Sequence, residues 1–192
     1  MDNAEAEIEA NLNATEAAIK RSLLHQLLGD GVTKRAPGKL DTRAGPELLV
    51  NGGFETGDFT GWTLTVNPLT NFLVGVTFIP WAVYEGNYAA YFGTIFFPVT
   101  LSQTIQTVPG QTYTFSYALA NVSPAQFNHF DAYFGTQEVE DITFAPSFPY
   151  TLRSWSVTAT STTTDVHFRF RNFAAFWLLD AVSVRVTVTP TE

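Results

Sequence analysis

Short segments of alternating apolar and polar residues follow one another along the chain from residue 61 onward. In Gln111–Ala120, tyrosine, phenylalanine and leucine occupy every second position, with threonine, serine and alanine between them. This alternation is typical of a β-strand with one buried apolar face and one hydroxyl-bearing face. Similar alternating or β-branched segments are Gly61–Val66, Phe72–Ile79, Tyr88–Gly93, Thr100–Val108, His129–Gly135, Tyr150–Thr160, Thr164–Arg171 and Trp177–Thr189. About nine strands with no helical periodicity between them predict two antiparallel sheets packed as an all-β sandwich.

One connection between these segments has a specific turn sequence, Val108-Pro109-Gly110-Gln111. Proline sets the backbone angle that the second turn position requires, and glycine tolerates the positive φ of the third. We therefore expect a tight turn at this point.

The first 28 residues follow a different period. Glycine and proline are absent between residues 3 and 28, and glycine follows at positions 29 and 31. Apolar residues recur there at steps of three and four, which predicts one amphipathic helix whose apolar stripe includes Ile8, Leu12, Ile19, Leu23 and Leu27. A lone helix of this length is only marginally stable in water, so the stripe needs a partner. We expect it to pack against the same helix in other copies of the chain, with packing on its own sandwich as the alternative.

Composition changes after residue 45 and marks a domain boundary. Residues 29–45 are rich in glycine, proline and charge, which is typical of a linker. All 17 phenylalanines, 7 tyrosines and 4 tryptophans lie beyond residue 45. The sequence therefore predicts a helical assembly arm at residues 1–28, a linker at 29–45 and a sandwich domain at 46–192.

The charge and cysteine content narrow the classes of partner. The chain of 192 residues carries 18 acidic and 10 basic residues, a formal net charge of −8, whereas a nucleic-acid-binding protein usually has a basic patch. No apolar run reaches the roughly 18 residues of a membrane-spanning helix. The N-terminus lacks the basic start and apolar core of a secretory signal. The absence of cysteine excludes disulfides and cysteine nucleophiles.

Several segments of the sandwich resemble a known family. Leu48–Trp62 reads LLVNGGFETGDFTGW, Trp81–Gly93 reads WAVYEGNYAAYFG, and Phe168–Val184 reads FRFRNFAAFWLLDAVSV. In this order and spacing they resemble the carbohydrate-binding-module-like (galactose-binding-like) jelly rolls, across residues 46–189. The resemblance is closest to the extracellular β-sandwich domains of bacterial proteins with a PEP-CTERM sorting tail. It implies a jelly-roll fold and a location outside the cell, on the cell surface or in a virion.

The same resemblance implies a structural calcium ion. Carbohydrate-binding relatives use a glutamate of the opening motif and an aspartate of the closing motif, and the matching positions here are Glu55 and Asp180. The second aspartate usual in the closing motif is replaced by Ala181. Calcium prefers six to eight oxygen ligands, so backbone carbonyls would have to supply most of them. The alternative is that Glu55 caps the following turn and Asp180 accepts hydrogen bonds from backbone amides. No cofactor is otherwise required, and His25, His129 and His167 lack the spacing of a zinc site.

Three groups of residues could bind a sugar by ring stacking and hydrogen bonding. The first is Trp81, Tyr84, Asn87 and Tyr88; the second is His129, Asp131 and Tyr133, which alternate on one strand; the third is Asn172, Phe176 and Trp177 at a loop. Each of these aromatic residues could instead pack in the core, and the sequence does not choose among the groups.

Signs of catalysis are weak. Glu138, Glu140 and Asp141 are close in sequence, but we expect them to form a solvated acidic edge. The chain has no nucleophile elbow, glycine-rich phosphate loop or metalloprotease motif. The protein is therefore expected not to be an enzyme.

The leading hypothesis is a structural or surface protein, a jelly-roll head that self-assembles into a homo-oligomer or polymer through its helical arm. Such a protein would suit an extracellular appendage, a surface layer or a virion fibre. The alternative is a carbohydrate-binding module for adhesion or targeting, with a glycan as its partner. A glycan-active hydrolase is a third and less favoured class.

Overall fold

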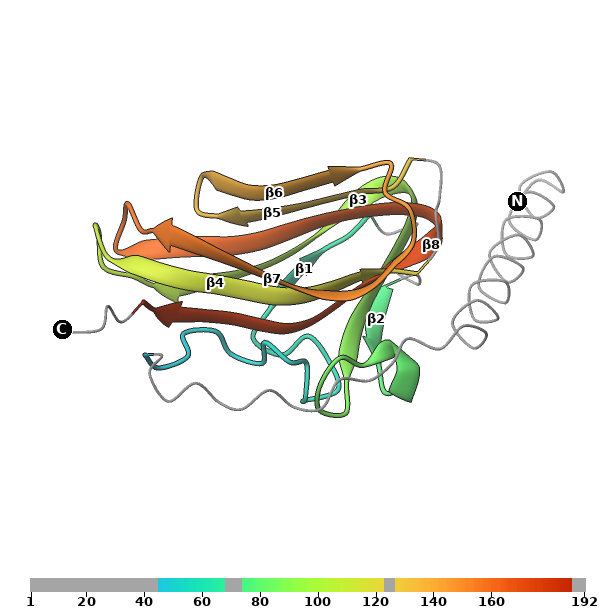
Figure 1. Ribbon diagram of the computed structural model, residues 1–192, viewed down its shortest axis with the longest axis horizontal. Helices are drawn as coiled ribbons and strands as arrows, with labels where there is room; N and C mark the ends of the chain where they lie inside the picture. Colours follow the sequence, from blue (N-terminus) through green and yellow to red (C-terminus); the bar gives the residue numbers. More distant parts are fainter. Residues whose placement is uncertain (1–44, 68–73, 123–126, 188–192) are drawn as a thin grey trace, which may run out of the picture. The chain divides into compact units, whose positions relative to one another are not determined.

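The computed structural model describes residues 45–67, 74–122 and 127–187 (Figure 1). Its strands are β1 (Thr63–Thr65), β2 (Val74–Thr77), β3 (Ala89–Gln106), β4 (Thr112–Asn121), β5 (His129–Phe134), β6 (Gln137–Thr143), β7 (Phe148–Thr158) and β8 (Thr163–Val186), with one turn of 3₁₀ helix at Pro80–Ala82. In these ranges no helix is long and apolar enough to cross a membrane. The predicted arm at 1–28 and the linker, apart from Gly45, lie outside the described residues.

Two long strands, β3 and β8, each take part in two antiparallel sheets (Figure 1). In one sheet, residues 177–186 of β8 pair with β4, and β7 continues beyond β4. The start of β3 and then β2 lie on the other side of β8 in this sheet. In the other, residues 163–171 of β8 lie between β5 and the second half of β3, with β6 and β1 at the edges. We call these the β4 sheet and the β5 sheet.

The strands differ from the sequence prediction in two ways. The segments expected at 88–93 and 100–108 form one strand, β3, and those at 164–171 and 177–189 form one strand, β8. The pairing of β3 with β8 is irregular between Phe92 and Val99, where the strands pass from one sheet to the other. In addition, β6 forms at a segment that was not expected to be a strand.

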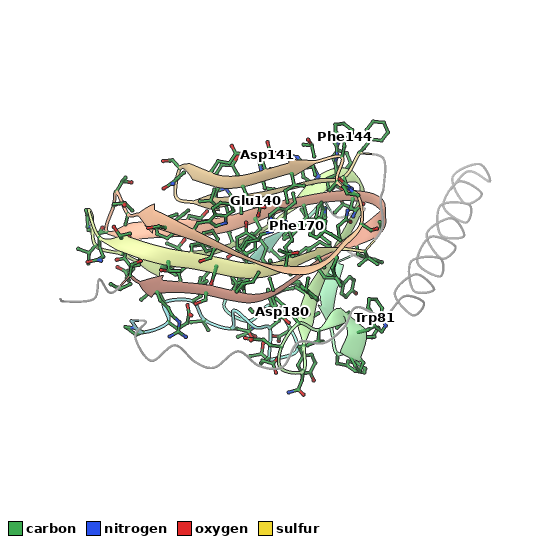
Figure 2. The ribbon with its side chains drawn as sticks, viewed as in Figure 1. Trp81, Glu140, Asp141, Phe144, Phe170 and Asp180 are labelled. Carbon is green, nitrogen blue, oxygen red and sulfur yellow. The ribbon has the colours of Figure 1, made fainter. Side chains whose placement is uncertain are left out.

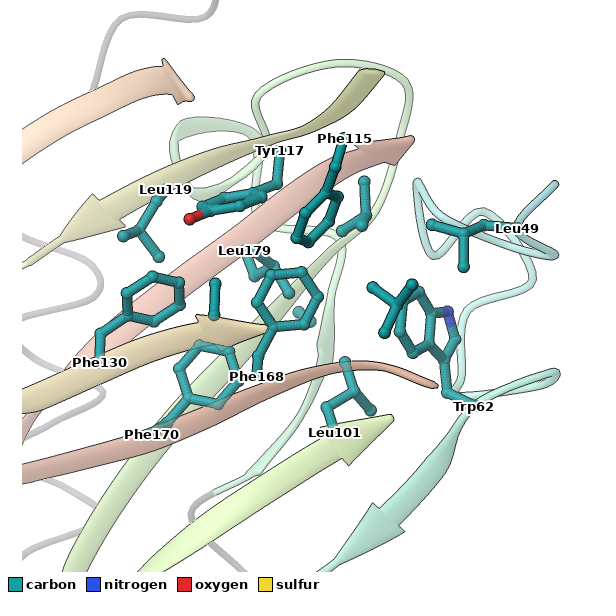
Figure 3. Close-up of a cluster of buried hydrophobic side chains, with 14 of the residues drawn as sticks. Leu49, Trp62, Leu101, Phe115, Tyr117, Leu119, Phe130, Phe168, Phe170 and Leu179 are labelled. Carbon is teal, nitrogen blue, oxygen red and sulfur yellow. The ribbon is translucent and has the colours of Figure 1, made fainter. Parts of the chain in front are cut away.

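The two sheets enclose an aromatic core (Figure 3). Phe115 and Tyr117 of β4 are buried and face Phe168 of β8, with the rings of Tyr117 and Phe168 edge to face at 5.1 Å. Phe130 of β5 likewise contacts Trp177 across the sandwich, with ring centroids 5.6 Å apart. Burial of these large rings supplies much of the apolar area that stabilises the fold.

The alternation predicted for β4 is confirmed along its apolar face and along the first half of the opposite face. The apolar set at every second position is buried, whereas Thr114 and Ser116 are only partly buried on the opposite face. Register places Thr114 beside Ser156 of β7, and Ser116 beside Ser183 of β8. The outer face of the β4 sheet is therefore lined by hydroxyl groups along the first half of β4, whereas Ala118 and Ala120 farther along the same face are fully buried.

The predicted turn at Val108–Gln111 is also confirmed. The amide of Gln111 donates to the carbonyl of Val108 at 3.0 Å, and Gly110 has a φ of 81°. The strands that the turn joins, β3 and β4, do not pair with each other, because β8 lies between them. The turn therefore carries the chain from the β5 sheet to the β4 sheet.

Glu140 of β6 corrects one sequence expectation. Its side chain is only 10% exposed, so it does not belong to a solvated acidic edge. It accepts a hydrogen bond from the Tyr117 hydroxyl at 2.6 Å, and Arg153 of β7 lies 3.2 Å away. Burial, together with this hydrogen bond, raises the pKa of Tyr117 far above its usual value. Glu140 thus joins the edges of the two sheets, whereas Glu138 and Asp141 remain exposed.

Candidate functional site

Polar and aromatic side chains cover the outer face of the β5 sheet. Strand alternation directs Phe130, Ala132 and Phe134 into the core, so the residues between them face outward. The neighbouring half of β8 has the same alternation. We define the polar face by the outward residues of these two strands: His129, Asp131, Tyr133, Asp165, His167 and Arg169.

Asp131 holds Arg169 in a fixed position on this face. The two residues are opposite each other in the pairing of β5 with β8, and Arg169 Nε donates to Asp131 Oδ1 at 2.7 Å. The Asp131 side chain is only 1% exposed, whereas that of Arg169 is 46% exposed. This hydrogen bond raises the pKa of the guanidinium further above its usual value. A buried carboxylate therefore positions an accessible guanidinium group.

Tyr133 and His167 form an aromatic pair next to Arg169. Their rings are nearly parallel, with an interplanar angle of 12° and centroids 4.6 Å apart. Arg169 Nη2 donates to the Tyr133 hydroxyl at 3.2 Å, and the guanidinium carbon lies 5.3 Å from the ring centroid. His167 Nδ1 lies 2.9 Å from Asp165 Oδ2. These contacts restrain both rings on the sheet surface.

His129 lies at the other end of the polar face, between two carboxylates. Its Nε2 is 3.1 Å from Asp141 Oδ1 and 3.3 Å from Asp131 Oδ2. Asp131 Oδ2 is buried and accepts no hydrogen bond from the described residues. Across the described part of the chain, no cluster of three or more histidine, aspartate or glutamate residues could hold a metal ion. The polar face therefore offers hydrogen-bonding groups and aromatic rings.

The second predicted group, His129, Asp131 and Tyr133, thus lies together on one face, as its alternation suggested. Sequence reasoning missed its partners on β8, His167 and Arg169. A signal for them was present, because histidine and arginine alternate with phenylalanine from residue 167 to residue 171. What the sequence could not show was that this segment lies beside β5.

Two members of the first predicted group, Asn87 and Tyr88, contact Glu55. The Glu55 carboxylate accepts hydrogen bonds from the backbone amides of Asn87 and Tyr88 at 2.9 to 3.1 Å. It also accepts one from the Asn87 side chain at 3.2 Å. The Tyr84 ring packs against Tyr150 with centroids 5.4 Å apart. Trp81 is partly buried, and its Nε1 is buried without a hydrogen-bond partner among the described residues. The structure therefore does not bring the four residues together around one ligand position, and Asn87 is the exposed member of the group.

The prediction that the third group forms the rim of a site is wrong. Trp177 is fully buried, and Asn172 and Phe176 are almost so. Trp177 Nε1 donates to the Arg171 carbonyl at 3.1 Å, and Asn172 Nδ2 donates to Asn121 Oδ1 at 3.1 Å. The expected loop between the two strands is instead part of β8, which places these side chains in the core.

The two residues of the predicted calcium site are both held by amide groups. Asp180 is fully buried and accepts hydrogen bonds from the amides of Tyr84, Glu85 and Ala181 at 2.6 to 3.1 Å. Backbone N–H groups cannot ligate a cation, and calcium requires several converging oxygens. The donors present therefore fit an amide-bonded clamp between the closing strand and the loop of residues 84–88 better than a metal centre. Calcium at Glu55 and Asp180 stays a prediction.

Comparisons with known proteins bear on the fold. No protein-family model matches the chain, and a search of curated proteins gave no match. Among solved structures, it is similar to TmCBM61 in complex with β-1,4-galactotriose, with a TM-score of 0.59 and 19% identity over 74% of this chain and 99% of that one. It is also similar to the C-terminal family 22 carbohydrate-binding module of Clostridium thermocellum Xyn10B, with a TM-score of 0.53 and 15% identity over 80% and 100% of the two chains.

A third similar structure is the enzymatically active domain of tailspike protein 4 from bacteriophage CBA120. The TM-score is 0.54 and the identity 11%, over 73% of this chain and 21% of that one. The PEP-CTERM resemblance stays a prediction from the sequence. The comparisons establish that the described residues form a jelly-roll β-sandwich of the kind found in carbohydrate-binding modules.

Proposed function

We propose that the sandwich is a non-catalytic carbohydrate-binding module and that its polar face binds the saccharide. The observation that carries the proposal is the exposed Arg169 guanidinium, which the buried Asp131 holds beside the rings of Tyr133 and His167. Side chains that are already ordered lose little conformational entropy when a ligand binds.

The chemistry of this face suits a sugar. A saccharide presents hydroxyl groups that exchange hydrogen bonds with guanidinium and carboxylate groups, and its C–H faces pack on aromatic rings. Arg169 and Tyr133 supply both kinds of group within one small area. The names of two similar structures support the same ligand class, since one contains β-1,4-galactotriose and the other is a carbohydrate-binding module.

The test is titration calorimetry of the whole chain against a panel of soluble polysaccharides. We expect Tyr133→Ala to weaken binding about tenfold, as loss of a central contact usually does. Arg169→Lys should also weaken binding, because lysine keeps the charge beside Asp131 but loses the planar fork of donors. Ser156→Ala, on the hydroxyl face of the β4 sheet, is the matched control and should bind like the wild type.

Two results would contradict the proposal: no binding by the wild type to any polysaccharide of the panel, or equal binding by all four proteins. Release of reducing sugars during the titration would instead indicate the hydrolase alternative.

Self-assembly is a separate prediction, because it depends on residues 1–28. Sedimentation velocity of the whole chain tests it directly. The arm hypothesis requires an oligomer or polymer, and a monomer at all concentrations would exclude it. Glycan binding by the sandwich does not depend on that result. We further infer an extracellular location, since polysaccharides are abundant outside cells.

A further inference from the structure

Two exposed phenylalanines lie together just beyond one end of the polar face. Phe127 is 57% exposed and Phe144 is 71% exposed, and their ring centroids are 6.2 Å apart at an interplanar angle of 63°. Figure 2 shows Phe144 projecting outward past the end of β6, in contrast to Phe170 within the sandwich. We call these two residues the phenylalanine pair.

The backbone at both residues has an unfavourable conformation. Phe127 has a φ of 73° and Phe144 a φ of 53°, in the left-handed region where glycine is the usual residue. Phe144 N–H donates to the Asn128 carbonyl at 3.1 Å, and Arg171 Nε donates to the Phe127 carbonyl at 3.3 Å. Non-glycine residues in this region are typical of sites where the surrounding structure enforces a functional geometry.

Asn128 fixes the backbone around both phenylalanines. It is buried between the two phenylalanines in sequence and space, and it exchanges two hydrogen bonds of 2.7 Å with the backbone of Ala145. Neither ring contributes much to the core, because both are largely exposed. The structure therefore holds two apolar rings in solvent, on a backbone conformation that glycine would adopt more easily.

Strand register places the phenylalanine pair beside the polar face. His129, the first residue of β5, is opposite Thr143 of β6 and Arg171 of β8, so the pair lies directly beyond this row. Tyr133 is four residues farther along β5, which corresponds to about 13 Å. A single sugar ring is too small to contact Tyr133 and the pair together.

We propose that Phe127 and Phe144 form an aromatic subsite for a distal unit of an oligosaccharide whose other units lie on the polar face. The inference rests on the proposed function and specifies its ligand class, a saccharide chain long enough to extend from Tyr133 past His129. Each unit of such a chain has apolar ring faces for the phenylalanines. Its hydroxyl groups can reach His129, Arg171 and the exposed carboxylate of Asp141, which lie in the adjoining rows.

Other occupants fit the pair less well. Two rings present far less than the roughly 1,000 Å² that a stable protein interface buries. The net charge of −8 opposes adsorption to an anionic membrane surface. A sugar chain needs only a small apolar platform with polar groups beside it, which is what this end of the face provides.

The experiment measures affinity for a length series, from monosaccharide to hexasaccharide, of the polysaccharide that the wild type binds best. The double variant Phe127→Ala/Phe144→Ala should bind the hexasaccharide about tenfold more weakly and the monosaccharide like the wild type. Phe78→Ala is the matched control, because Phe78 is 74% exposed in a different segment and should have no effect on either ligand.

A second variant separates binding from stability. Phe144→Gly removes the ring and also suits the positive φ, so it should weaken hexasaccharide binding without lowering the urea midpoint of unfolding. Equal hexasaccharide binding by the double variant and the wild type would overturn the inference. The proposed function would survive that result if Tyr133→Ala still weakened binding.

Failure of the wild type to bind any saccharide would instead refute the proposed function itself. Loss of self-association or of vesicle binding in the double variant, with saccharide affinity unchanged, would assign the pair to another partner and overturn the inference.

Discussion

Asp180 makes a testable contribution to the pH dependence of stability. Its carboxylate is fully buried, and burial raises its pKa from 3.8 to about 7 even though the amides of Tyr84, Glu85 and Ala181 act in the opposite direction. The folded protein therefore keeps a proton on Asp180 up to nearly neutral pH. The unfolded chain releases the same proton near pH 4.

This difference makes the folded state less stable as the pH rises. Between the unfolded and the folded pKa, Asp180 binds more protons in the folded state, so its contribution to the free energy of unfolding falls with increasing pH and becomes constant above about pH 7. One pKa unit corresponds to about 1.4 kcal/mol, so the full shift of the Asp180 pKa from 3.8 to about 7 corresponds to about 4 kcal/mol of unfolding free energy. From pH 5 to pH 8 the expected loss is about 3 kcal/mol.

Urea unfolding at pH 5 and pH 8, in buffer with EDTA, measures this loss. Asp180→Asn is the comparison, because asparagine cannot ionise. The substitution removes one hydrogen-bond acceptor, which lowers the free energy of unfolding by an amount that does not depend on pH. The wild type should lose about 3 kcal/mol more than this variant between the two pH values. Parallel pH profiles for the two proteins would show that the buried carboxylate is not protonated near neutrality, and would refute the reasoning.

Three further predictions concern packing and calcium. Gly52→Ala should be strongly destabilising in thermal melts, because its Cβ would lie 1.9 Å from the Val182 carbonyl oxygen, whereas Gly53→Ala meets only ordinary contacts and should be nearly neutral. Phe168→Ala should lower the free energy of unfolding by about 3–5 kcal/mol, since the ring is fully buried, and Phe78→Ala should change it by less than about 0.5 kcal/mol in the same urea assay. The melting temperature should be equal in calcium and in EDTA, since amides already satisfy the two carboxylates; an increase with calcium would instead support the predicted site.

The local pattern of apolar and polar residues predicted the fold class well, because their alternation directly reflects burial of one side of a strand. The apolar positions of β4 are buried as expected. The same pattern could not show that β3 and β8 continue from one sheet into the other. Proline is rare inside a central strand, yet β3 continues through Pro98, in the stretch where its pairing with β8 is irregular.

The candidate site was only partly predictable, for a related reason. Alternation placed His129, Asp131 and Tyr133 on one face, and the structure agrees. Their contacts with Arg169 depend on pairing between strands 38 residues apart, which no local pattern encodes. Trp177 shows the opposite failure, because an aromatic residue near a presumed loop has the same local sequence whether it is exposed or buried.

The position of β8 also has a consequence for biosynthesis. This strand pairs with β3, β4 and β5, so it lies in the middle of both sheets, yet among the described strands of the sandwich it is synthesised after all the others. Before β8 is synthesised, β4 can pair with β7 and β5 with β6. Each sheet still lacks its central strand, so the apolar faces of these strand pairs stay incompletely buried. Such long-range pairing is slow and exposes apolar surface to aggregation. We therefore expect nascent chains that end before Thr163 to stay protease-sensitive and to depend on chaperones until β8 is complete.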